Sequence, residues 1–203
     1  MKPLPRAQSP ALRGYAKIET IRLRLRRFTH NDLDDFASIC SDPDVMKYIG
    51  AGTPVSREEL EPVFLSGYIN YWDKHGFGRF AVINKERDEL IGACGLRRFA
   101  YPGLDLFENN LEIVFLLKKS FWRQGFATEA AKACLTYAFD HLSAERVVAM
   151  TMRENVASRR VIEKIGMEHE TDVRFLDSDC VVYVIARQAF QSDDSARRII
   201  YSA

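Results

Sequence analysis

A glycine between an apolar run and an amphipathic stretch is the feature of this sequence that points most clearly to chemistry. The run Leu111–Leu117 is interrupted only by Glu112, and Gly125 opens a helical pattern that reaches Phe139. A glycine at a helix start lets backbone N–H groups approach an anion, and the helix N-terminus adds a partial positive charge. The pattern therefore indicates a phosphate cradle. A plain turn is the alternative, since no Gly-Lys-Ser/Thr sequence follows to make a nucleotide-hydrolysing loop.

The cysteines and histidines do not have the spacing of a metal site. The four cysteines are far apart, have apolar neighbours and form no C-x-x-C pair, and the four histidines form no H-x-x-x-H pair. We interpret the cysteines as buried thiols and expect no bound metal. These residues are Cys40, Cys94, Cys134 and Cys180, and His30, His75, His141 and His169.

The first half of the chain predicts a strand, two helices and a hairpin. Ile21, Leu23 and Leu25 alternate with arginines, which is the period-two pattern of a half-exposed strand. Thr29 and Ser56 each stand three positions before an acidic residue, as at a helix start. Residues 80–83 and 90–96 should pair as an antiparallel hairpin. The apolar faces of the two helices are Leu33, Phe36, Ala37 and Cys40, and Leu60, Phe64, Tyr68 and Tyr71.

The second half predicts a central strand, two further helices and a closing hairpin. The run 111–117 should lie in the middle of a sheet, and residues 147–152 form another strand. Asn155 is expected to cap a helix that ends at Gly166, and residues 170–186 close the fold as a hairpin. The buried helix positions are predicted to be Ala127, Ala131, Cys134 and Ala138 in the first helix and Ala157, Val161 and Ile165 in the second.

Length and charge exclude several classes of protein. The 203 residues fit one domain, which we place at residues 18–190, with tails at 1–17 and 191–203. The net charge of +1 creates no positive field that would attract nucleic acid. No apolar run approaches the roughly 20 residues of a membrane span, and the polar N-terminus does not resemble a secretory signal. The expectation is a cytoplasmic protein without a membrane partner, either monomer or homodimer.

Four segments in order along the chain resemble the GNAT acetyltransferase superfamily. In the CoA-binding pattern [QR]-x-x-G-x-[GA] of that family, Gly125 and Ala127 match the last two positions, and Trp122 replaces the first. The ribosomal-protein alanine N-acetyltransferase (RimJ/RimL-like) branch often has aromatic-Trp-x-x-Gly-aromatic-Ala-Thr-Glu, which residues 121–129 match. Segments 41–50, 75–96 and 155–167 are also similar to that branch, so the likeness covers about residues 18–187.

The resemblance implies an α/β fold of the GNAT acyl-CoA N-acyltransferase type, with a splayed, mostly antiparallel mixed sheet flanked by helices. Acetyl-CoA, the co-substrate, would lie between the strands at 111–117 and 147–152. Its pantetheine arm would bond to the backbone of Phe115, Leu116 and Leu117 and contact Asn155, with Ser158 one helical turn further on, near the sulfur. Its pyrophosphate would rest on the amides of Arg123, Gln124, Gly125, Phe126, Ala127 and Thr128.

Acetyl transfer to an amine needs a base for the amine proton and an acid for the departing thiolate. Glu112 on the central strand is the first candidate base, acting through water, unless it is a charge on an exposed sheet face. Asp179, before Cys180, is a second carboxylate that similar enzymes place at the substrate mouth. Many relatives use as acid a tyrosine seven residues after the asparagine, but Ile162 stands there. Ser158 is therefore the candidate acid, unless it only caps its helix.

The acceptor is expected to be the α-amine of a protein or peptide N-terminus. The α-amine has a reference pKa of about 7.7–8.0, whereas that of lysine is about 10.4, so the α-amine needs less help from a base. A backbone N–H near Val114 or Phe115 should stabilise the oxyanion. A polyamine or an aminoglycoside is an alternative acceptor, although residues 44–78 and 98–110 carry no strong acidic cluster. A non-catalytic acyl-CoA-binding module is the alternative of another class.

Overall fold

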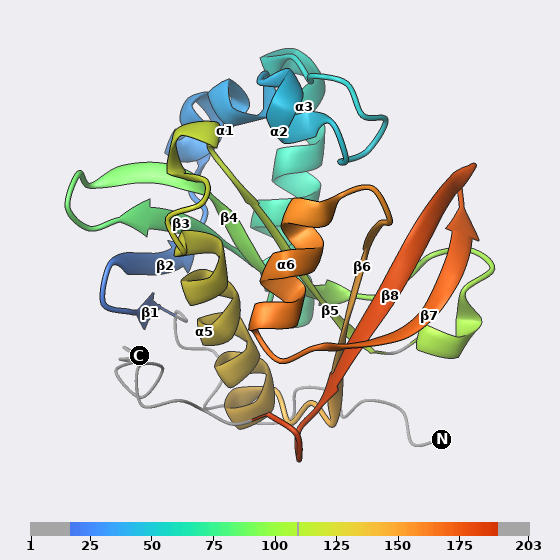
Figure 1. The fold of residues 1–203 in the computed structure, drawn as a ribbon. Coiled ribbons are helices and arrows are strands. Elements are labelled where there is room, and N and C mark those ends of the chain that lie inside the picture. Colours follow the sequence, from blue (N-terminus) through green and yellow to red (C-terminus); the bar gives the residue numbers. More distant parts are fainter. Residues whose placement is uncertain (1–16, 109, 191–203) are drawn as a thin grey trace.

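The computed structural model describes residues 17–108 and 110–190 and contains one mixed sheet with helices on both faces (Figure 1). Apart from Lys17, the predicted tails lie outside these residues. The strands are β1 Ile18–Glu19, β2 Leu23–Arg27, β3 Arg79–Asn84, β4 Glu89–Arg98, β5 Leu111–Leu117, β6 Arg146–Met152, β7 Glu168–Phe175 and β8 Ser178–Ala186. The α-helices are α1 Leu33–Cys40, α2 Pro43–Met46, α3 Arg57–Phe64, α4 Asn70–His75, α5 Phe126–His141 and α6 Val156–Lys164. Shorter helical turns are η2 His30–Asp32, η3 Leu65–Ile69, η4 Asp105–Phe107 and η5 Lys119–Phe121.

The sheet runs in the order β1-β2-β3-β4-β5-β6-β8-β7. Every neighbouring pair is antiparallel except β5 and β6, which are parallel. The long connection that a parallel pair requires is provided by α5, which joins the end of β5 to β6. The predicted mostly antiparallel sheet with a central strand at 111–117 is thus confirmed.

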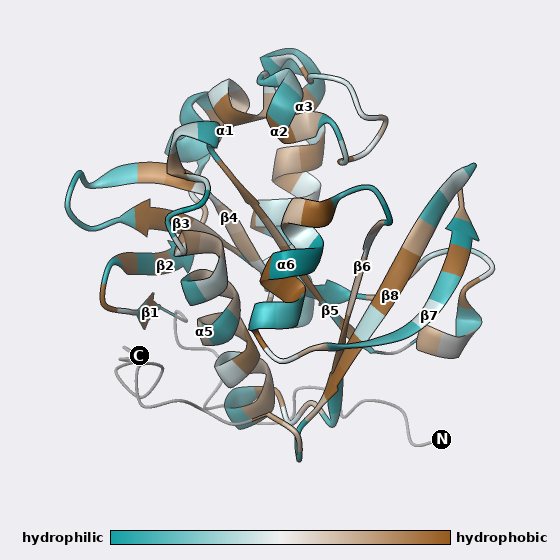
Figure 2. Cartoon of the chain, in the orientation of Figure 1, coloured by the Kyte–Doolittle hydropathy of each residue, from teal (hydrophilic) through white to brown (hydrophobic). Residues whose placement is uncertain are grey.

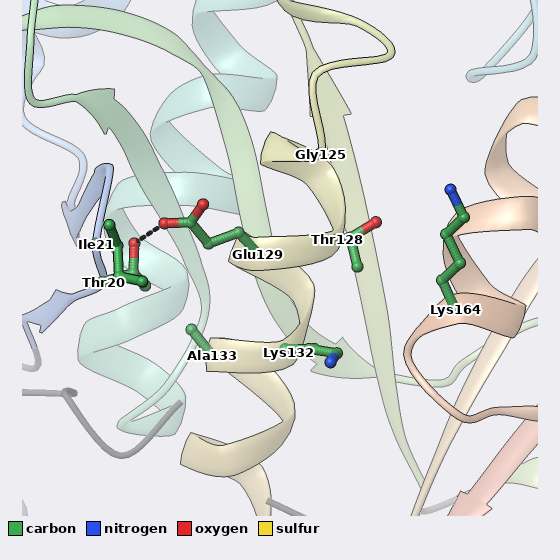
Figure 3. A pocket seen from close by; sticks show the side chains of 8 residues that line it. All are labelled: Thr20, Ile21, Gly125, Thr128, Glu129, Lys132, Ala133 and Lys164. Carbon is green, nitrogen blue, oxygen red and sulfur yellow. Dashed lines mark hydrogen bonds between the residues drawn. The ribbon is translucent and has the colours of Figure 1, made fainter. Parts of the chain in front are cut away.

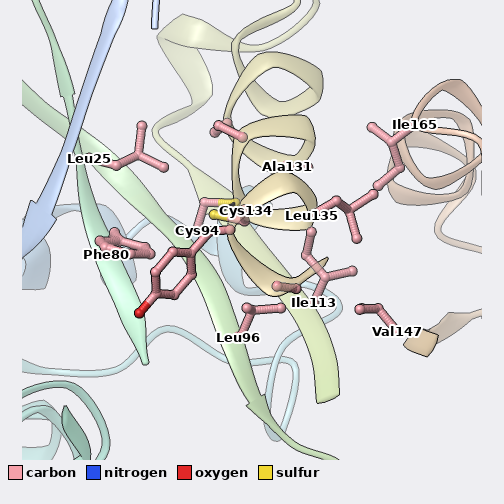
Figure 4. Packing of buried hydrophobic residues seen from close by; sticks show 14 of the residues in the cluster. Leu25, Phe80, Cys94, Leu96, Ile113, Ala131, Cys134, Leu135, Val147 and Ile165 are labelled. Atoms are coloured by element: carbon pink, nitrogen blue, oxygen red, sulfur yellow. Dashed lines mark hydrogen bonds between the residues drawn. The ribbon is translucent and has the colours of Figure 1, made fainter. Parts of the chain in front are cut away.

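Two helical layers cover opposite faces of the sheet. Helices α5 and α6 pack on the face formed by alternate residues of the central strands, such as Cys94, Ile113 and Val147 (Figure 4). The other face carries a second core with α1 and α3, in which Phe36 and Phe64 are buried. A third, smaller cluster lies under the loop after β4 and includes Phe99 and Phe107.

Hydropathy follows this layering (Figure 2). Strands β4 and β8 are buried along most of their length, whereas the edge strand β7 alternates between exposed and half-buried residues. All four cysteines are free and buried, as predicted. The Cys94 and Cys134 sulfur atoms lie 3.6 Å apart across the interface between β4 and α5, although the sequence separates them widely.

The N-terminal strand differs from the prediction at its start. Ile21 is exposed because the chain bends there, and β2 begins at Leu23. A short strand β1, which the sequence pattern did not reveal, pairs antiparallel with β2 before this bend. The Arg22 side chain therefore points away from the sheet edge toward α5, where its Nε donates to Glu129 Oε2 at 2.7 Å.

Two helix faces also differ from the prediction. A π-helical turn, η3, follows α3, and a wider turn rotates all later side chains relative to an ideal α-helix. Leu60, Phe64 and Tyr68 face the core that contains α1, whereas Trp72 is buried in the core that contains α5 and the half-buried Tyr71 packs against that same core. In α6 the predicted core residue Ile165 is buried, but Val161 is only half-buried and Ala157 is exposed. Ile162, which was not predicted to be buried, packs inward beside Ile165.

Within residues 17–108 and 110–190, no helix combines the length and the apolarity needed to span a membrane. The same residues hold no group of His, Cys, Asp and Glu side chains arranged to bind a metal ion.

Candidate functional site

Strands β5 and β6 are paired only at their beginnings. Leu111 pairs with Val147 and Glu112 with Val148, but both strands continue beyond these pairs and diverge (Figure 1). Residues 114–116 of β5 and 150–152 of β6 are only half-buried, although both strands lie in the middle of the sheet. Beyond Glu112, the edge of β5 that faces β6 has no partner among the strands that the structure describes, so an extended ligand can hydrogen-bond to it.

Glu112 lies at the point where the two strands part. Its side chain is 1% exposed, which rules out the alternative of a charge on an open sheet face. Arg97 Nε donates to Glu112 Oε2 at 2.7 Å, and the Tyr101 hydroxyl donates to Glu112 Oε1 at 3.0 Å. Burial raises the pKa of Glu112, whereas the charges of Arg97 and Arg79 and a hydrogen bond from the Met150 amide lower it. The net shift is upward, so this carboxyl is a better proton acceptor than an exposed glutamate.

Sequence reasoning missed the partners of Glu112. Arg97 stands directly opposite Glu112 in the β4–β5 register, and its guanidinium also contacts the Tyr101 hydroxyl. Tyr101 belongs to the loop after β4 and packs edge-on against Phe175 at the end of β7. The alternation of β4 could have placed Arg97 on one face, but only the register between the strands shows which residue it meets.

The loop between β5 and α5, residues 118–125, is braced from two sides. Arg22 Nη1 donates to Gln124 O at 2.9 Å, and the Arg22 guanidinium lies 4.2 Å from the centre of the Phe126 ring. Trp122 Nε1 donates to Leu117 O at 2.7 Å. Trp122, which departs from the family pattern, thus ties the loop to the end of β5.

Gly125 is the N-cap of α5 and has a φ of +83°, a conformation that favours glycine. The first three amides of the helix, from Phe126 to Thr128, have no acceptor within the helix, so they are available to an anion. A Cβ atom added at Gly125 would lie 3.3 Å from Arg22 Nη2. A side chain would therefore enter the space where the loop and the helix start form a cradle.

A pocket runs along the first turns of α5 (Figure 3). Thr20 and Ile21 line one side, and Lys164 of α6 lines the other. Between them lie the Thr128 and Lys132 side chains of α5. Two lysines and one carboxylate thus line this pocket, and the carboxylate, Glu129, is paired with Arg22.

Asn155 and Ser158 lie at the start of α6. Asn155 Oδ1 accepts a hydrogen bond from the Ser158 backbone N–H at 3.1 Å, which confirms the predicted cap. The Ser158 hydroxyl makes no hydrogen bond with any residue that the structure describes, so it is not the group that caps the helix. Ile162, at the position of the tyrosine used by many relatives, is buried.

Asp179 is not brought together with Glu112. Its side chain is 69% exposed near the tip of the β7–β8 hairpin and forms an ion pair with Arg174 at 3.1 Å. Its backbone carbonyl accepts a hydrogen bond from Arg153 N at 2.8 Å, which places it beside the chain that leads from β6 to α6.

Comparisons with known proteins agree with this geometry. The family model described as acetyltransferase (GNAT) domain matches residues 22–168. The N-acetyltransferase YnaD of Bacillus subtilis is 35% identical over 153 residues, which cover 75% of this chain and 83% of that protein. The FsC-acetyl coenzyme A-N(2)-transacetylase of Aspergillus fumigatus is 27% identical over 162 residues, covering 78% of this chain and 67% of that protein.

A solved structure is also similar. The crystal structure of a GNAT-family acetyltransferase from Bacillus anthracis superimposes with a TM-score of 0.69 at 29% identity. The superposition covers 85% of this chain and 99% of that chain.

Proposed function

The chain belongs to the GNAT acetyltransferase family, and we propose that it acetylates the α-amine of a protein or peptide N-terminus. Family membership makes the chain an acetyl-CoA-dependent N-acetyltransferase; the acceptor class and the residue roles are the proposal. One observation carries it: the strands β5 and β6 part beside a buried carboxylate, Glu112. This arrangement provides a gap for the donor and a proton acceptor at the same point.

Acetyl-CoA would lie along the free edge of β5 and end on the α5 cradle. The N–H and C=O groups of Phe115 point away from β4 and would bond to the pantetheine arm, whereas those of Leu116 point toward Ala93 of β4. Leu117 has less capacity because its carbonyl already accepts from Trp122. The amides of residues 123–128 would hold the pyrophosphate. Asn155 Oδ1 is occupied by the Ser158 amide, so the Asn155 Nδ2 group is what remains for the cofactor arm.

The reaction joins the acceptor nitrogen to the acetyl carbon and breaks the bond from that carbon to sulfur. Glu112 accepts the amine proton, and Tyr101, whose hydroxyl is 3.0 Å from Glu112 Oε1, can relay it because Tyr101 is the more exposed of the two. Ser158, with its uncommitted hydroxyl, passes a proton to the departing thiolate and takes one up from solvent in exchange. A backbone N–H near Val114 or Phe115 would stabilise the oxyanion. Asp179 is a weaker candidate base because it is exposed and paired with Arg174.

An α-amine fits this site better than a lysine or a polyamine. Burial raises the pKa of Glu112, but the charge of Arg97 limits this rise and so limits the strength of Glu112 as a base. A base of limited strength suits an amine that is already partly neutral at cell pH, as an α-amine is. The residues around Glu112 are arginines and tyrosines, which do not attract a polycation. The sequence likeness to the ribosomal-protein alanine N-acetyltransferase branch supports the same acceptor.

The test has a donor arm and an acceptor arm. In the donor arm, Gly125→Glu should abolish acetyl-CoA binding in calorimetry, because a side chain and a negative charge enter the cradle. Gly76→Glu is the matched control, since Gly76 also has a positive φ, of +75°, but ends α4 far along the chain from the cradle. Equal affinity in folded Gly125→Glu would contradict the placement.

In the acceptor arm, a lysine-free peptide with a free N-terminus competes with an N-blocked peptide that contains lysine. Acetylated products are then identified by mass spectrometry. Acetylation of the free N-terminus supports the proposal. Acetyl groups found only on lysine, or only on an added polyamine, would contradict the acceptor class but not the acetyltransferase activity.

A further inference from the structure

We infer that Arg79 and Arg97 form an anion-binding subsite next to Glu112, and that the preferred acceptor carries a carboxylate close to its reacting amine. The inference rests on the proposed function, because it concerns an α-amine that reaches Glu112. It adds a substrate class to that function: an amine that is itself part of an acidic molecule.

The two arginines lie on the same face of the sheet as Glu112. Arg97 is directly opposite Glu112, and Arg79 is opposite Gly95, two residues before Arg97 on β4. Residues two apart on a strand point to the same face, and diagonal neighbours on adjacent strands are about 7–8 Å apart. The two arginine side chains therefore leave the backbone at neighbouring positions on the same face of the sheet.

The β4 residue between the two arginines has no side chain. Gly95 stands between them on β4, and a Cβ atom there would lie 2.4 Å from Gly78 O and 2.5 Å from the Arg79 Cα. Strands β3 and β4 approach too closely at this point to admit any other residue. Strand β4 therefore presents only backbone at Gly95, and Tyr68 packs beside Arg79.

Both guanidinium groups keep donors available. Arg79 Nη1 donates to Gly67 O at 3.0 Å in the π-helical turn, and the Arg79 guanidinium lies 4.8 Å from the centre of the Tyr68 ring. Among residues 17–108 and 110–190, no carboxylate lies within ion-pair distance of Arg79. Arg97 spends Nε on Glu112 and Nη2 on Tyr101, but its side chain is still 31% exposed.

The local charge is positive. Two guanidinium groups face one carboxylate, Glu112, and both arginine charges also act on Tyr68: burial raises the pKa of Tyr68, and Arg79 and Arg97 lower it. A carboxylate on the acceptor would balance the second arginine, and charge-assisted bonds from a guanidinium are among the stronger hydrogen bonds. A polyamine would add positive charge to an already positive site.

The carboxylate has two sources that share this chemistry. It can be the α-carboxylate of a free amino acid, or the side chain of an acidic residue near the N-terminus of a peptide. Two matched pairs of acceptors separate them: alanine against alanine amide for the α-carboxylate, and the amidated peptides Ala-Glu-Ala and Ala-Gln-Ala for the side chain. For each pair, the ratio of kcat/KM with and without the carboxylate is measured by CoA release.

We expect the wild-type protein to favour the carboxylate in at least one pair by about tenfold to a hundredfold, as for hydrogen bonds to charged groups. Arg79→Gln should bring that ratio close to one, and Arg79→Lys should keep part of it, because lysine retains the charge but loses the planar fork. Arg24→Gln is the matched control, since Arg24 lies on β2 and pairs with Asp88. It should leave the ratio unchanged.

A ratio near one in the wild-type protein, or a full ratio in Arg79→Gln, overturns the inference and leaves the proposed function standing. Turnover of polyamines without turnover of any α-amine overturns the proposed function itself, and the inference with it. The pair that shows the preference identifies whether the acidic group belongs to an amino acid or to a peptide side chain.

Discussion

Replacing Glu112 with glutamine removes the proton acceptor at the point where β5 and β6 part but keeps the size of the side chain. The amide oxygen introduced by this substitution can still accept from Arg97, and the Arg97 side chain is 31% exposed, so water can compensate for the lost charge. We therefore expect a folded protein with nearly unchanged affinity for acetyl-CoA. The loss should appear in kcat, because only proton removal is affected.

The size of the loss should depend on pH. With a reference pKa of about 7.8, an α-amine is about 5% neutral at pH 6.5 and about 94% neutral at pH 9. A general base typically contributes a factor of about 100 or more where the amine is protonated. We expect E112Q to be about 100-fold slower at pH 6.5 and only roughly 5-fold slower at pH 9, because the neutral fraction rises by roughly 20-fold over this range.

The assay is the pH profile of kcat for both proteins, measured by CoA release at saturating acetyl-CoA. A uniform loss across the range would indicate that Glu112 positions Arg97 and Tyr101 and does not accept the proton. A variant with full activity at pH 6.5 would refute the reasoning altogether.

Stability provides an independent check on the buried carboxyl. Because burial raises the pKa of Glu112 against the opposing charge of Arg97, the folded protein holds this proton at pH values where the unfolded chain has released it. The unfolded state then binds fewer protons, and the free energy of unfolding falls as pH rises from about 4.5 toward the raised pKa. E112Q lacks this contribution. Urea unfolding across the window should show the variant gaining stability relative to the wild type as pH rises, and a constant difference would contradict the raised pKa.

Three further outcomes follow from the geometry. Ser158→Ala should lower kcat with little change in melting temperature, because alanine keeps the backbone N–H that Asn155 caps. The control, Asn155→Ala, should lose about 1 kcal/mol of stability in urea unfolding. Asp179→Asn should leave the pH profile of kcat unchanged and alter stability by less than about 0.5 kcal/mol, since its ion pair is exposed; a shifted acidic limb would restore Asp179 as the base. Gly95→Ala should cost about 2 kcal/mol or more in chemical denaturation, because its Cβ would meet the backbone of Gly78 and Arg79, and a neutral result would contradict the close strand approach.

The sequence predicted the elements that depend on local patterns. The strand at 111–117, the Ser56 cap, the glycine that starts α5 and the Asn155 cap all follow from short-range periodicity or from side-chain-to-backbone bonds, and the structure has each of them. The π-helical turn was not predictable, because the wide turn in residues 65–69 is set by packing and not by any residue type. For the same reason, the sequence did not show that Tyr71 and Trp72 pack against a different core from Leu60, Phe64 and Tyr68.

The candidate site was predictable in its backbone and less so in its side chains. Glu112 was expected on a central strand, but whether it was buried or exposed depended on which face the helices cover. Arg97 and Arg79 come near it only through the registers of two antiparallel pairs, and register is fixed by the whole buried face of the sheet. The bracing of the cradle by Arg22 depends on a bend between β1 and β2 that the alternating pattern concealed.

The interruption between β5 and β6 also divides the sheet into two parts with unequal connections. Seven register pairs join β4 to β5 and seven join β6 to β8, but only two join β5 to β6. A donor molecule that bonded to the free edge of β5 would link the two parts of the sheet for as long as it stayed bound. By mass action, a ligand at 100 times its dissociation constant stabilises the folded state by about 2.7 kcal/mol. The supply of acetyl-CoA in the cell would then govern two things together, the rate at which this enzyme works and the time for which it survives proteolysis.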